Sequence, residues 1–558
     1  MSAFETTKKR IESALQGALV KILAEFNIRY TPGNLPLAFS DDFSHGDLAS
    51  SLALVWAKEA KTSPFELASK IKENIGDIPG VKVVEIAGPG FINFFLTKDI
   101  FAGTIEFARS EDMWGRGDAL SGKKIMVEYT DPNPFKEFHI GHLMSNAIGE
   151  SISRLFQFEG ADVKRANYQG DVGPHVAKAI WGIKKLGVDP KDAAAVGKAY
   201  SAGASAYEED PQAKEEIDAI NAKVYDRSND EINTIYDEGR RSTLAHFEEL
   251  YAILGTKFDF YFFESETAPL GLAQIGAHSG IFKLSDGAVV YEGSHTRVFI
   301  NSKGLPTYEA KEIGLAQMKQ EKFPADVYIT ITASEQDGFF QVVFEAMERV
   351  LPELAGKLVH RSHGMMRFTD GKMSSRTGNI ITGESLLNDL IVAAKERAAE
   401  SRADDKEKLA EQVAVAAIKY QVLRQATGKN IIFDREKALS LEGDSGPYLQ
   451  YAYARTQAIK ERAGDLQAKA DVSAEPNTVT RLIPRFPEIV ARAVEHLEPH
   501  ILTTYLLELA SAFNAWYAQE QILDGTSAAA HKLAVVEAIG RTLKNGLWIL
   551  GIPAPEKM

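Results

Sequence analysis

Two histidines, separated by an isoleucine and a glycine, form the sharpest chemical signal in the chain: His139-Ile140-Gly141-His142. They lie between a predicted strand and a predicted helix. Two imidazoles at a helix start, with glycine between them, bring hydrogen-bond donors, the positive helix end and bare backbone to one place. Such a turn can bind a polyphosphate, although the histidines could also only cap the helix.

A second segment, residues 371–379, carries Lys372, Ser374, Ser375 and Arg376 between two glycines. A glycine-bracketed loop with cations and hydroxyls suits a cover over a triphosphate, where it would stabilise the charge on a leaving pyrophosphate. Taken alone, the segment could equally be a solvated surface loop.

The elements that must position these motifs follow an alternating pattern. A strand at 125–129, a helix at 142–158 and a strand at 162–167 make a βαβ unit, which predicts a parallel sheet covered by helices. The same pattern resumes later, with helices expected at 308–319 and 339–350 and strands at 327–331 and 357–360. Between the halves, residues 175–305 read as an insertion of helices followed by a hairpin that turns at Asp286-Gly287.

The two ends of the chain have different patterns. The first 26 residues repeat apolar side chains every three to four positions, as an amphipathic helix does, and 81–86 and 91–96 read as a hairpin. From about residue 386 onward the periodicity is almost entirely helical. The sequence therefore predicts a small α+β domain before the parallel sheet and a helical bundle after it.

Composition sets limits on the function. The chain has 558 residues, 45% hydrophobic and 25% charged, as is usual for globular proteins. It has no cysteine, which excludes disulfides, thiol nucleophiles and thiolate zinc sites. The net charge of −14 means that a nucleic acid would have to bind at local basic patches. We expect a cytoplasmic protein with no membrane segment and no secretion signal.

Together and in this order, the two motifs resemble the HIGH and KMSKS signatures of class I aminoacyl-tRNA synthetases. Further segments resemble the arginyl-tRNA synthetase family: residues 85–93, 127–129, 132–133 with Lys136, 446–452 and 550–558. The resemblance extends from residue 85 to the C-terminus.

This resemblance implies a multidomain fold. Residues 1–112 would be an N-terminal α+β domain that contacts the tRNA elbow. Residues 113–385 would be a Rossmann-like α/β catalytic domain with a parallel sheet and the 175–305 insertion. Residues 386–558 would be an all-α helical bundle that binds the anticodon.

The implied activity is ligation of arginine to tRNA. The family activates L-arginine with ATP to arginyl-adenylate and pyrophosphate, then transfers the arginyl group to the 3′-terminal adenosine of tRNA(Arg). By position, His139 and His142 would contact the ATP phosphates, and Gly141 would leave room for adenosine. Lys372, Ser374, Ser375 and Arg376 would close over pyrophosphate. Magnesium carried by ATP is the metal we expect, with no zinc.

The second lysine of KMSKS is replaced by Ser375 in this chain. In the arginyl family a lysine just before the HIGH motif is thought to compensate, and here that residue is Lys136. We therefore expect Lys136 to matter more than Lys372, unless it is only an exposed loop lysine.

The guanidinium of arginine demands a planar, bidentate acceptor, which a carboxylate supplies. The resemblance places an arginine site at Tyr308 and Glu312, with Glu128 as a second candidate carboxylate. It also implies that Asn133 and Gln336 hold the α-amino and carboxylate groups of arginine. Glu312 stands where the family has aspartate, so Glu309 remains an alternative, and both could be ordinary exposed helix residues.

His360 and His363 could form a metal pair, but no third ligand is evident, so we expect a structural role or a place near the adenosine. For the RNA, Tyr448, Tyr451 and Trp516 are candidate platforms for unpaired anticodon bases. Aromatic residues at helical spacing more often belong to the hydrophobic core.

The resemblance also implies an oligomeric state: members of this family are usually monomers that need bound tRNA before they activate arginine.

Three other functions remain open from the sequence. The chain could be a class I synthetase for lysine or glutamine, but the context of Glu128 and Asn133 weighs against it. A catalytically silent tRNA-binding paralogue would be expected to lose the histidines or the loop. A generic nucleotidyltransferase would not need the large helical domain.

Overall fold

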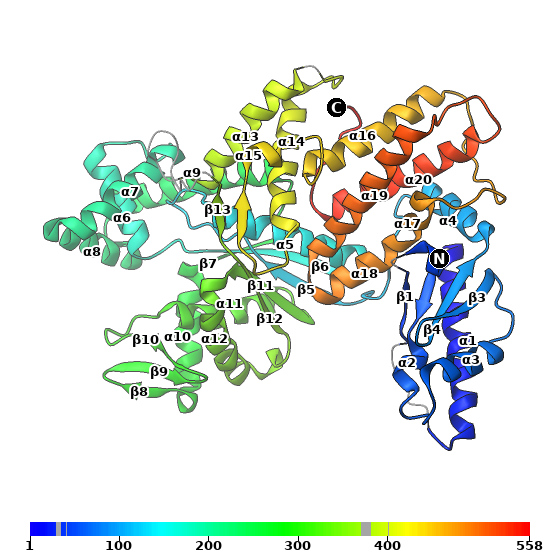
Figure 1. Ribbon diagram of the computed structural model, residues 1–558. Coiled ribbons are helices and arrows are strands. Elements are labelled where there is room, and N and C mark those ends of the chain that lie inside the picture. Colours follow the sequence, from blue (N-terminus) through cyan, green and yellow to red (C-terminus); the bar gives the residue numbers. More distant parts are fainter. Residues whose placement is uncertain (30–34, 41, 370–380, 400) are drawn as a thin grey trace.

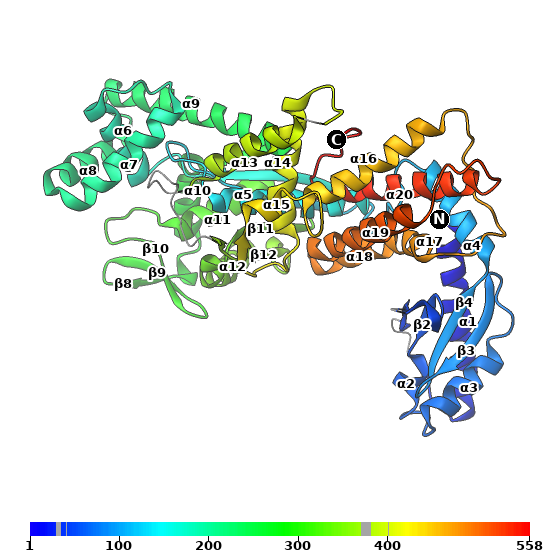
Figure 2. The ribbon, with the colours of Figure 1, turned by 45° about the horizontal axis from the view of Figure 1, so that its top comes forward.

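The computed structural model describes residues 1–29, 35–40, 42–369, 381–399 and 401–558. The chain forms a central α/β body, a helical bundle beside it and a smaller N-terminal domain that projects away from both (Figures 1 and 2). The predicted multidomain fold is confirmed. Among the described residues, no helix is both long and apolar enough to pass through a membrane.

The N-terminal domain has its own core. Helix α1 (Ala3–Glu25) buries Ile11, Leu15, Leu19, Ile22 and Leu23, as the helical periodicity predicted. This helix and the short helices α2 (Leu52–Trp56) and α3 (Pro64–Asn74) pack with an antiparallel sheet in the order β1-β2-β4-β3. Its strands are β1 (Leu37–Phe39), β2 (Leu48–Ser50), β3 (Val81–Ala87) and β4 (Phe91–Leu96). The hairpin of β3 and β4 was predicted.

The central body is built on a five-stranded parallel sheet in the order β12-β11-β5-β6-β7. Its strands are β5 (Lys124–Glu128), β6 (Asp162–Gln169), β7 (Phe260–Phe263), β11 (Val327–Ala333) and β12 (Leu358–His363). Alternate residues of β5 enter two cores: Ile125 and Val127 pack in one core with helix α5 (Ile140–Phe158), and Met126 packs in another with α11 (Tyr308–Lys322) and α12 (Asp337–Val350). Helices therefore cover both faces of the sheet, as expected for a parallel sheet.

The stretch 175–305 is not one continuous insertion. Four helices extend from the sheet: α6 (Pro174–Leu186), α7 (Ala193–Glu209), α8 (Pro211–Asp226) and α9 (Asp230–Leu254). The chain then returns to the sheet as β7, which pairs with β6, and continues into α10 (Glu264–Ala277). A second excursion forms the antiparallel strands β8 (Lys283–Ser285), β9 (Ala288–Glu292) and β10 (Thr296–Ile300), with the predicted turn at Asp286-Gly287. The sequence pattern did not separate β7 from its surroundings because this strand is only four residues long.

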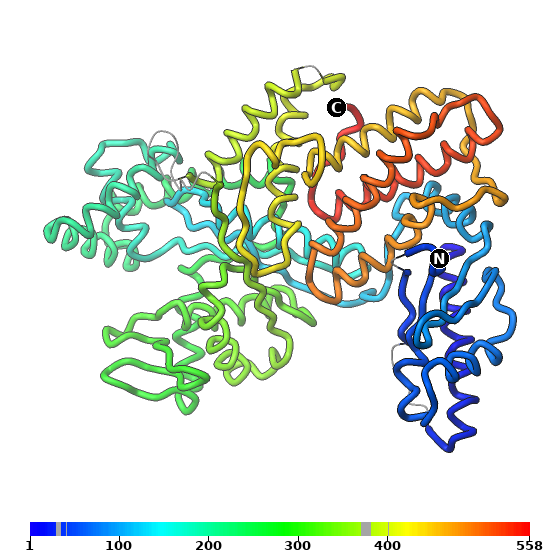
Figure 3. The backbone as a smooth tube through the Cα atoms, in the orientation of Figure 1, coloured from blue at the N-terminus to red at the C-terminus, as the bar shows by residue number. Residues whose placement is uncertain are grey.

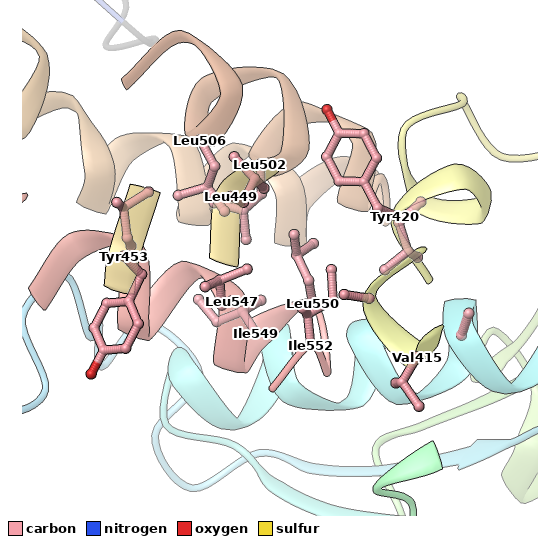
Figure 4. Packing of buried hydrophobic residues seen from close by; sticks show 14 of the residues in the cluster. Val415, Tyr420, Leu449, Tyr453, Leu502, Leu506, Leu547, Ile549, Leu550 and Ile552 are labelled. Atoms are coloured by element: carbon pink, nitrogen blue, oxygen red, sulfur yellow. The ribbon is translucent and has the colours of Figure 1, made fainter. Parts of the chain in front are cut away.

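The C-terminal bundle shares a core with the central body. Its helices are α13 (Gly383–Ala398), α14 (Lys406–Leu423), α15 (Arg435–Ala438), α16 (Gly446–Ala463), α17 (Thr478–Leu482), α18 (Phe486–His496), α19 (Pro499–Gln519) and α20 (Ala529–Ile549). Figure 4 shows Leu449, Leu502, Leu506 and Leu547 from three of them packed together above the cyan helix α5. From about residue 386 onward we expected almost only helices. The structure also has a strand there, β14 (Ile431–Phe433), which pairs in parallel with β13 (Met366–Phe368).

The N-terminal domain is joined to the bundle by helix α4 (Lys98–Ser110) and by polar contacts. Lys8 pairs with Glu488, Arg481 with Asp47, and Arg485 Nη2 donates to the Ser40 carbonyl at 2.9 Å. The red C-terminal segment in Figure 3 runs back beside helices α14 and α16, where Gln450 Nε2 donates to the Pro553 carbonyl at 2.9 Å.

Candidate active site

The two histidines of the H-x-G-H motif stack on each other at the start of α5. Their ring centroids lie 3.4 Å apart, and the His139 amide donates to Nδ1 of His142 at 3.1 Å. Loss of surrounding water, together with the nearby charge of Lys136, lowers the pKa of His139 to about 4. Burial also holds the pKa of His142 well below its usual value. Two neutral imidazoles therefore stand beside the positive helix end, where an anion can bind.

The loop between β5 and the histidines has a strained backbone. Thr130, Asp131 and Phe135 have φ of 80°, 48° and 67°, in the left-handed region that non-glycine residues rarely adopt. Side chains of α5 hold the loop: the Thr130 amide donates to Ser145 Oγ at 2.9 Å, and Asn146 Nδ2 donates to Thr130 Oγ1 at 3.1 Å. Such strain persists only where the surroundings enforce it, and it clusters at functional sites.

Three carboxyl groups gather where β5 ends. Glu128 is the last residue of β5 and only 3% exposed, Asp131 follows in the loop, and Glu312 reaches in from α11. Burial and the charge of Glu128 raise the pKa of Glu312 to about 8. The same two causes raise the pKa of Asp131 well above its usual value. Lys319 contributes one positive charge, with Nζ 2.5 Å from Glu128 Oε2. This acidic cluster is suited to a cationic ligand.

The sequence did not decide which glutamate of α11 would bind the guanidinium, and the structure places the two in different surroundings. Glu309 is paired with Arg297, whose Nη1 lies 3.2 Å from Glu309 Oε1. Among the described residues, no ion pair engages Glu312, which faces the acidic cluster instead. Tyr308, at the start of the helix, is 62% exposed, with the ammonium of Lys311 5.1 Å from its ring centroid.

Asn133 lies in the same loop as Asp131, two residues further along the chain. Its Oδ1 accepts a hydrogen bond of 2.7 Å from the Gly170 amide. A Cβ at Gly170 would come within 2.8 Å of that oxygen, so this close approach requires glycine. Glu264 also borders Gly170, and its Oε2 pairs with Lys311 Nζ at 2.6 Å.

Lys136 is half-buried between the loop and the inserted helices. Its ammonium lies 5.3 Å from the ring centroid of Tyr200 on α7. Burial lowers the pKa of Lys136, and the charge of Glu264 opposes that shift. A lysine so placed is not an ordinary exposed loop lysine, since an inserted helix packs against it.

Gln336 and the later histidines lie near the ends of β11 and β12. Gln336 is exposed in a short 3-10 turn (Ser334–Gln336) directly after β11. His360 stacks on Phe340 with centroids 4.4 Å apart, and its Nε2 is 2.8 Å from Thr332 Oγ1. His363 contacts the Gly364 carbonyl through Nδ1 at 2.8 Å. The described parts of the chain hold no group of three or more acidic or histidine side chains arranged to bind a metal.

Lys372, Ser374, Ser375 and Arg376 lie outside the described residues. The chain that follows them is anchored at the histidine turn: the Gly383 amide donates to the Phe138 carbonyl at 2.7 Å. A Cβ at Gly383 would come within 2.8 Å of the His139 carbonyl oxygen.

The aromatic residues predicted to face RNA divide into two groups. Tyr448 and Tyr451 on α16 are partly exposed, whereas Trp516 on α19 is only 9% exposed and so presents almost no ring surface. Its neighbour Tyr517 is partly exposed instead. The guanidinium of Arg455 lies 4.8 Å from the ring centroid of Tyr451 and 4.9 Å from that of Tyr517. These three side chains form one surface, which we call the Tyr451–Arg455–Tyr517 surface.

Sequence reasoning missed two residues of the acidic cluster, Asp131 and Lys319, and two of this surface, Arg455 and Tyr517. Asp131 could have been noticed as an acid within the loop that precedes the histidines. Lys319 lies seven positions after Glu312 in a helix, which places both on one face. Tyr517 had no distinguishing signal, because periodicity alone does not show which of two adjacent aromatic residues is covered.

Three family models match most of the chain. Residues 111–435 match the catalytic domain of class I (R) tRNA synthetases, 449–558 the DALR anticodon binding domain, and 6–96 the arginyl tRNA synthetase N terminal domain.

Individual proteins match along nearly the whole chain. The arginine–tRNA ligase of Treponema denticola is 31% identical, in an alignment that covers 92% of this chain and 93% of that protein. That of Borrelia garinii is 28% identical and covers 99% of this chain and 100% of that protein. The solved arginyl-tRNA synthetase of Thermus thermophilus superposes with a TM-score of 0.80 at 26% identity, covering 98% of this chain and 100% of that one. The chain therefore belongs to the arginyl-tRNA synthetase family, within class I of the aminoacyl-tRNA synthetases.

Proposed function

We propose that the acidic cluster and the stacked histidines form one active site, in which L-arginine and ATP react side by side. The chain is an arginine–tRNA ligase, the activity of its family. It joins arginine to ATP as arginyl-adenylate, releasing pyrophosphate, and then transfers the arginyl group to the 3′-terminal adenosine of tRNA(Arg). The observation that carries the proposal is the gathering of Glu128, Asp131 and Glu312 at the end of β5, where the loop that leads to His139 and His142 begins.

Arginine binds with its guanidinium at the acidic cluster. Glu312 is the principal acceptor, because Glu309 is already engaged by Arg297. Glu128 supplies a second carboxylate, and Tyr308 lies at the entrance. Asn133 and Gln336 bind the α-amino and carboxylate groups. A substrate without the guanidinium would leave these buried acids unpaired, so no editing step is required.

ATP binds across the histidine turn. His139 and His142 contact the phosphates at the helix end, and Gly141 leaves room for the adenosine. The arginine carboxylate oxygen attacks the α-phosphorus, the new P–O bond forms, and pyrophosphate leaves with the electrons of the broken P–O bond. Lys136 stabilises the phosphate charge from the loop, together with Lys372, Ser374, Ser375 and Arg376. Magnesium enters with ATP as part of the substrate.

The tRNA spans the separate domains. The N-terminal domain contacts its elbow, and the bundle reads its anticodon. Because the net charge is −14, stacking on aromatic side chains has to contribute to binding. Tyr448, Tyr451 and Tyr517 present partly exposed rings for this purpose, whereas Trp516 is buried. The protein acts as a cytoplasmic monomer that requires bound tRNA for arginine activation.

The test is arginine-dependent exchange of pyrophosphate into ATP, with and without total tRNA, for the wild type and His142→Ala. We expect exchange that needs both arginine and tRNA and that collapses in the variant. Exchange with another amino acid in place of arginine would contradict the proposed specificity. Full exchange by His142→Ala would contradict the proposed site.

A further inference from the structure

The N-terminal domain projects away from the bundle, and the chain leaves it through helix α4 (Figure 2). Domains that meet through polar contacts usually move relative to one another. The side chains beside α4 therefore decide whether the angle between this domain and the bundle is free or fixed.

Asp47 is a buried acid whose ion pair reaches outside its own domain. Its Oδ2 accepts a hydrogen bond of 2.8 Å from the Leu96 amide, and its own amide donates to the Phe94 carbonyl at 2.8 Å, so the residue is fixed to β4. The side chain is 4% exposed, and its Oδ1 pairs with Arg481 of α17. In the part of the chain that the structure describes, Asp47 forms no other ion pair. A buried carboxylate without a partner is costly, so Asp47 favours the one placement in which it meets Arg481.

A second arginine of the bundle, Arg485, makes contacts with the same turn of the N-terminal domain. The guanidinium groups of Arg481 and Arg485 each lie 5.2 Å from the ring centroid of Phe43. Arg485 also lies 5.1 Å from the ring centroid of Phe39, and its Nη2 donates to the Ser40 carbonyl. A guanidinium is planar and its donors point in fixed directions, so these contacts define an angle as well as a distance.

The segment that carries both arginines is held firmly in the bundle. Leu482, Ile483 and Phe486 are fully buried in the core that the bundle shares with the central body. The hydroxyl of Tyr505 on α19 donates to the Leu482 carbonyl at 3.1 Å. The arginines therefore do not follow the N-terminal domain when it turns, and a change of its angle has to break their contacts.

We propose that Arg481 and Arg485 lock the N-terminal domain at one angle to the bundle, so that one tRNA(Arg) reaches its elbow contact and its anticodon contact together. We call these two arginines, with Asp47 and Phe43, the interdomain lock. Its members are positioning residues, which act through the placement of the domain. The inference rests on the tRNA contacts proposed above. Two contacts held at a fixed separation bind one tRNA more tightly than the same contacts on loosely joined domains, because the effective concentration of the second contact is higher.

The test compares the binding of full-length tRNA(Arg) with that of an RNA hairpin made of its anticodon stem and loop alone. The hairpin can contact the bundle but lacks the elbow. We expect Arg481→Met to weaken the binding of full-length tRNA about tenfold, as a loss of effective concentration predicts. The affinity for the hairpin should stay at the wild-type value, and so should the KM values for arginine and ATP at saturating tRNA.

A distance measurement reports the angle itself. The chain has no cysteine, so Lys72→Cys on α3 and Lys460→Cys on α16, both at exposed positions, give two sites for spin labels. We expect a narrow distribution of label distances with the intact interdomain lock and a broad one when Arg481→Met is added.

The matched control is Lys98→Met. Lys98 also pairs across the two domains, with Glu475, but its side chain is 37% exposed and that of Glu475 is 80% exposed. An exposed pair contributes little, so this variant should change neither the tRNA affinity nor the label distances. Asp47→Asn should weaken full-length tRNA binding as Arg481→Met does. The two changes combined should add little further, because the residues act as a pair.

Arg485→Met removes the hydrogen bond to Ser40 without leaving a buried acid unpaired, and it keeps the test available if Arg481→Met does not fold. The proposal is overturned if tRNA and hairpin lose affinity equally, or if the label distances in both arginine variants stay as narrow as in the wild type. Failure of the underlying tRNA contacts would show separately, as a wild type that binds the hairpin as tightly as full-length tRNA.

Discussion

The hydroxyl of Tyr129 donates a hydrogen bond of 2.6 Å to Oε2 of Glu150, and so ties the residue after β5 to the middle of α5. Glu150 also pairs with Arg154 at 2.6 Å and with Arg165 at 3.0 Å. Lys419 of the bundle lies close enough for its charge to help lower the pKa of Glu150, and it donates to the carbonyl of Gly551 at 2.9 Å. One buried carboxylate therefore links the strand that carries Glu128, the histidine helix and the C-terminal bundle.

We expect Glu150→Gln to destabilise the protein by about 3–5 kcal/mol, because it leaves buried cations without their counter-ion. The neighbouring charges of Arg154 and Arg165 lower the pKa of Glu150 to about 2 despite its burial, below the unfolded value. Its contribution is therefore complete above about pH 4.5 and is lost as the pH falls toward 2. Urea unfolding at pH 7, 4.5 and 3 measures this. Glu407→Gln breaks an exposed pair with Lys395 and should cost less than about 1 kcal/mol. Similar losses in the two variants would contradict the prediction.

Glu312→Gln is expected to raise the KM for arginine by about 10- to 150-fold, since a hydrogen bond to a charged partner contributes about 1.5–3 kcal/mol. The KM for ATP should change little. Glu309→Gln, which alters the neighbouring ion pair with Arg297, is the matched control and should have a much smaller effect. Pyrophosphate exchange at varied arginine and ATP measures both constants. A larger effect from Glu309→Gln would reassign the guanidinium site.

The KM for arginine in the wild type should fall as the pH rises from 6.5 to 8.5. Burial and the charge of Glu128 raise the pKa of Glu312 to about 8, so the empty site holds a proton there at neutral pH. The guanidinium must displace this proton, which costs up to about tenfold in affinity for each pH unit below 8. The slope should be weaker in Glu312→Gln. Equal slopes in the two proteins would show that another group titrates.

The KM for ATP should show no step from histidine titration between pH 6 and 8. The pKa of His139 is lowered to about 4, and that of His142 lies well below its usual value, so both rings are already neutral in this range. Steady-state kinetics in constant ionic strength at saturating arginine test this. A transition near pH 6.5 that disappears in His139→Ala would show that the ring is charged in the free enzyme.

Tyr451→Ala and Tyr517→Ala should each weaken binding of tRNA(Arg) by about 5- to 150-fold, if one base stacks on each ring. The KM for arginine in exchange at saturating tRNA should not change. Tyr453→Phe is the control, because Tyr453 is 2% exposed and its ring points away from the leucines of the bundle core in Figure 4. Filter binding or fluorescence titration gives the affinities. Normal affinity in both alanine variants would exclude this surface as the anticodon contact.

Local patterns in the sequence determined much of the fold. The spacing of Ile11, Leu15 and Leu19 predicted α1, and the βαβ order around His139 predicted the parallel sheet, because these signals depend on residues close together in the chain. The family was also evident from motifs. The short strands β7 and β14 escaped notice because each is defined by its partner strand and not by its own pattern.

The roles of individual side chains depended on contacts between distant segments. Helical periodicity placed Glu309 and Glu312 on one helix. Only the packing of β10 and β5 against α11 shows that Glu309 pairs with Arg297, whereas Glu312 lies in the acidic cluster. The ion pair of Lys319 with Glu128, and the burial of Trp516 beside a partly exposed Tyr517, were decided in the same way. The sequence by itself determined the elements and the chemistry they carry. The tertiary structure decided which charges meet, because burial and Coulomb interactions depend on distances in space that a linear pattern does not contain.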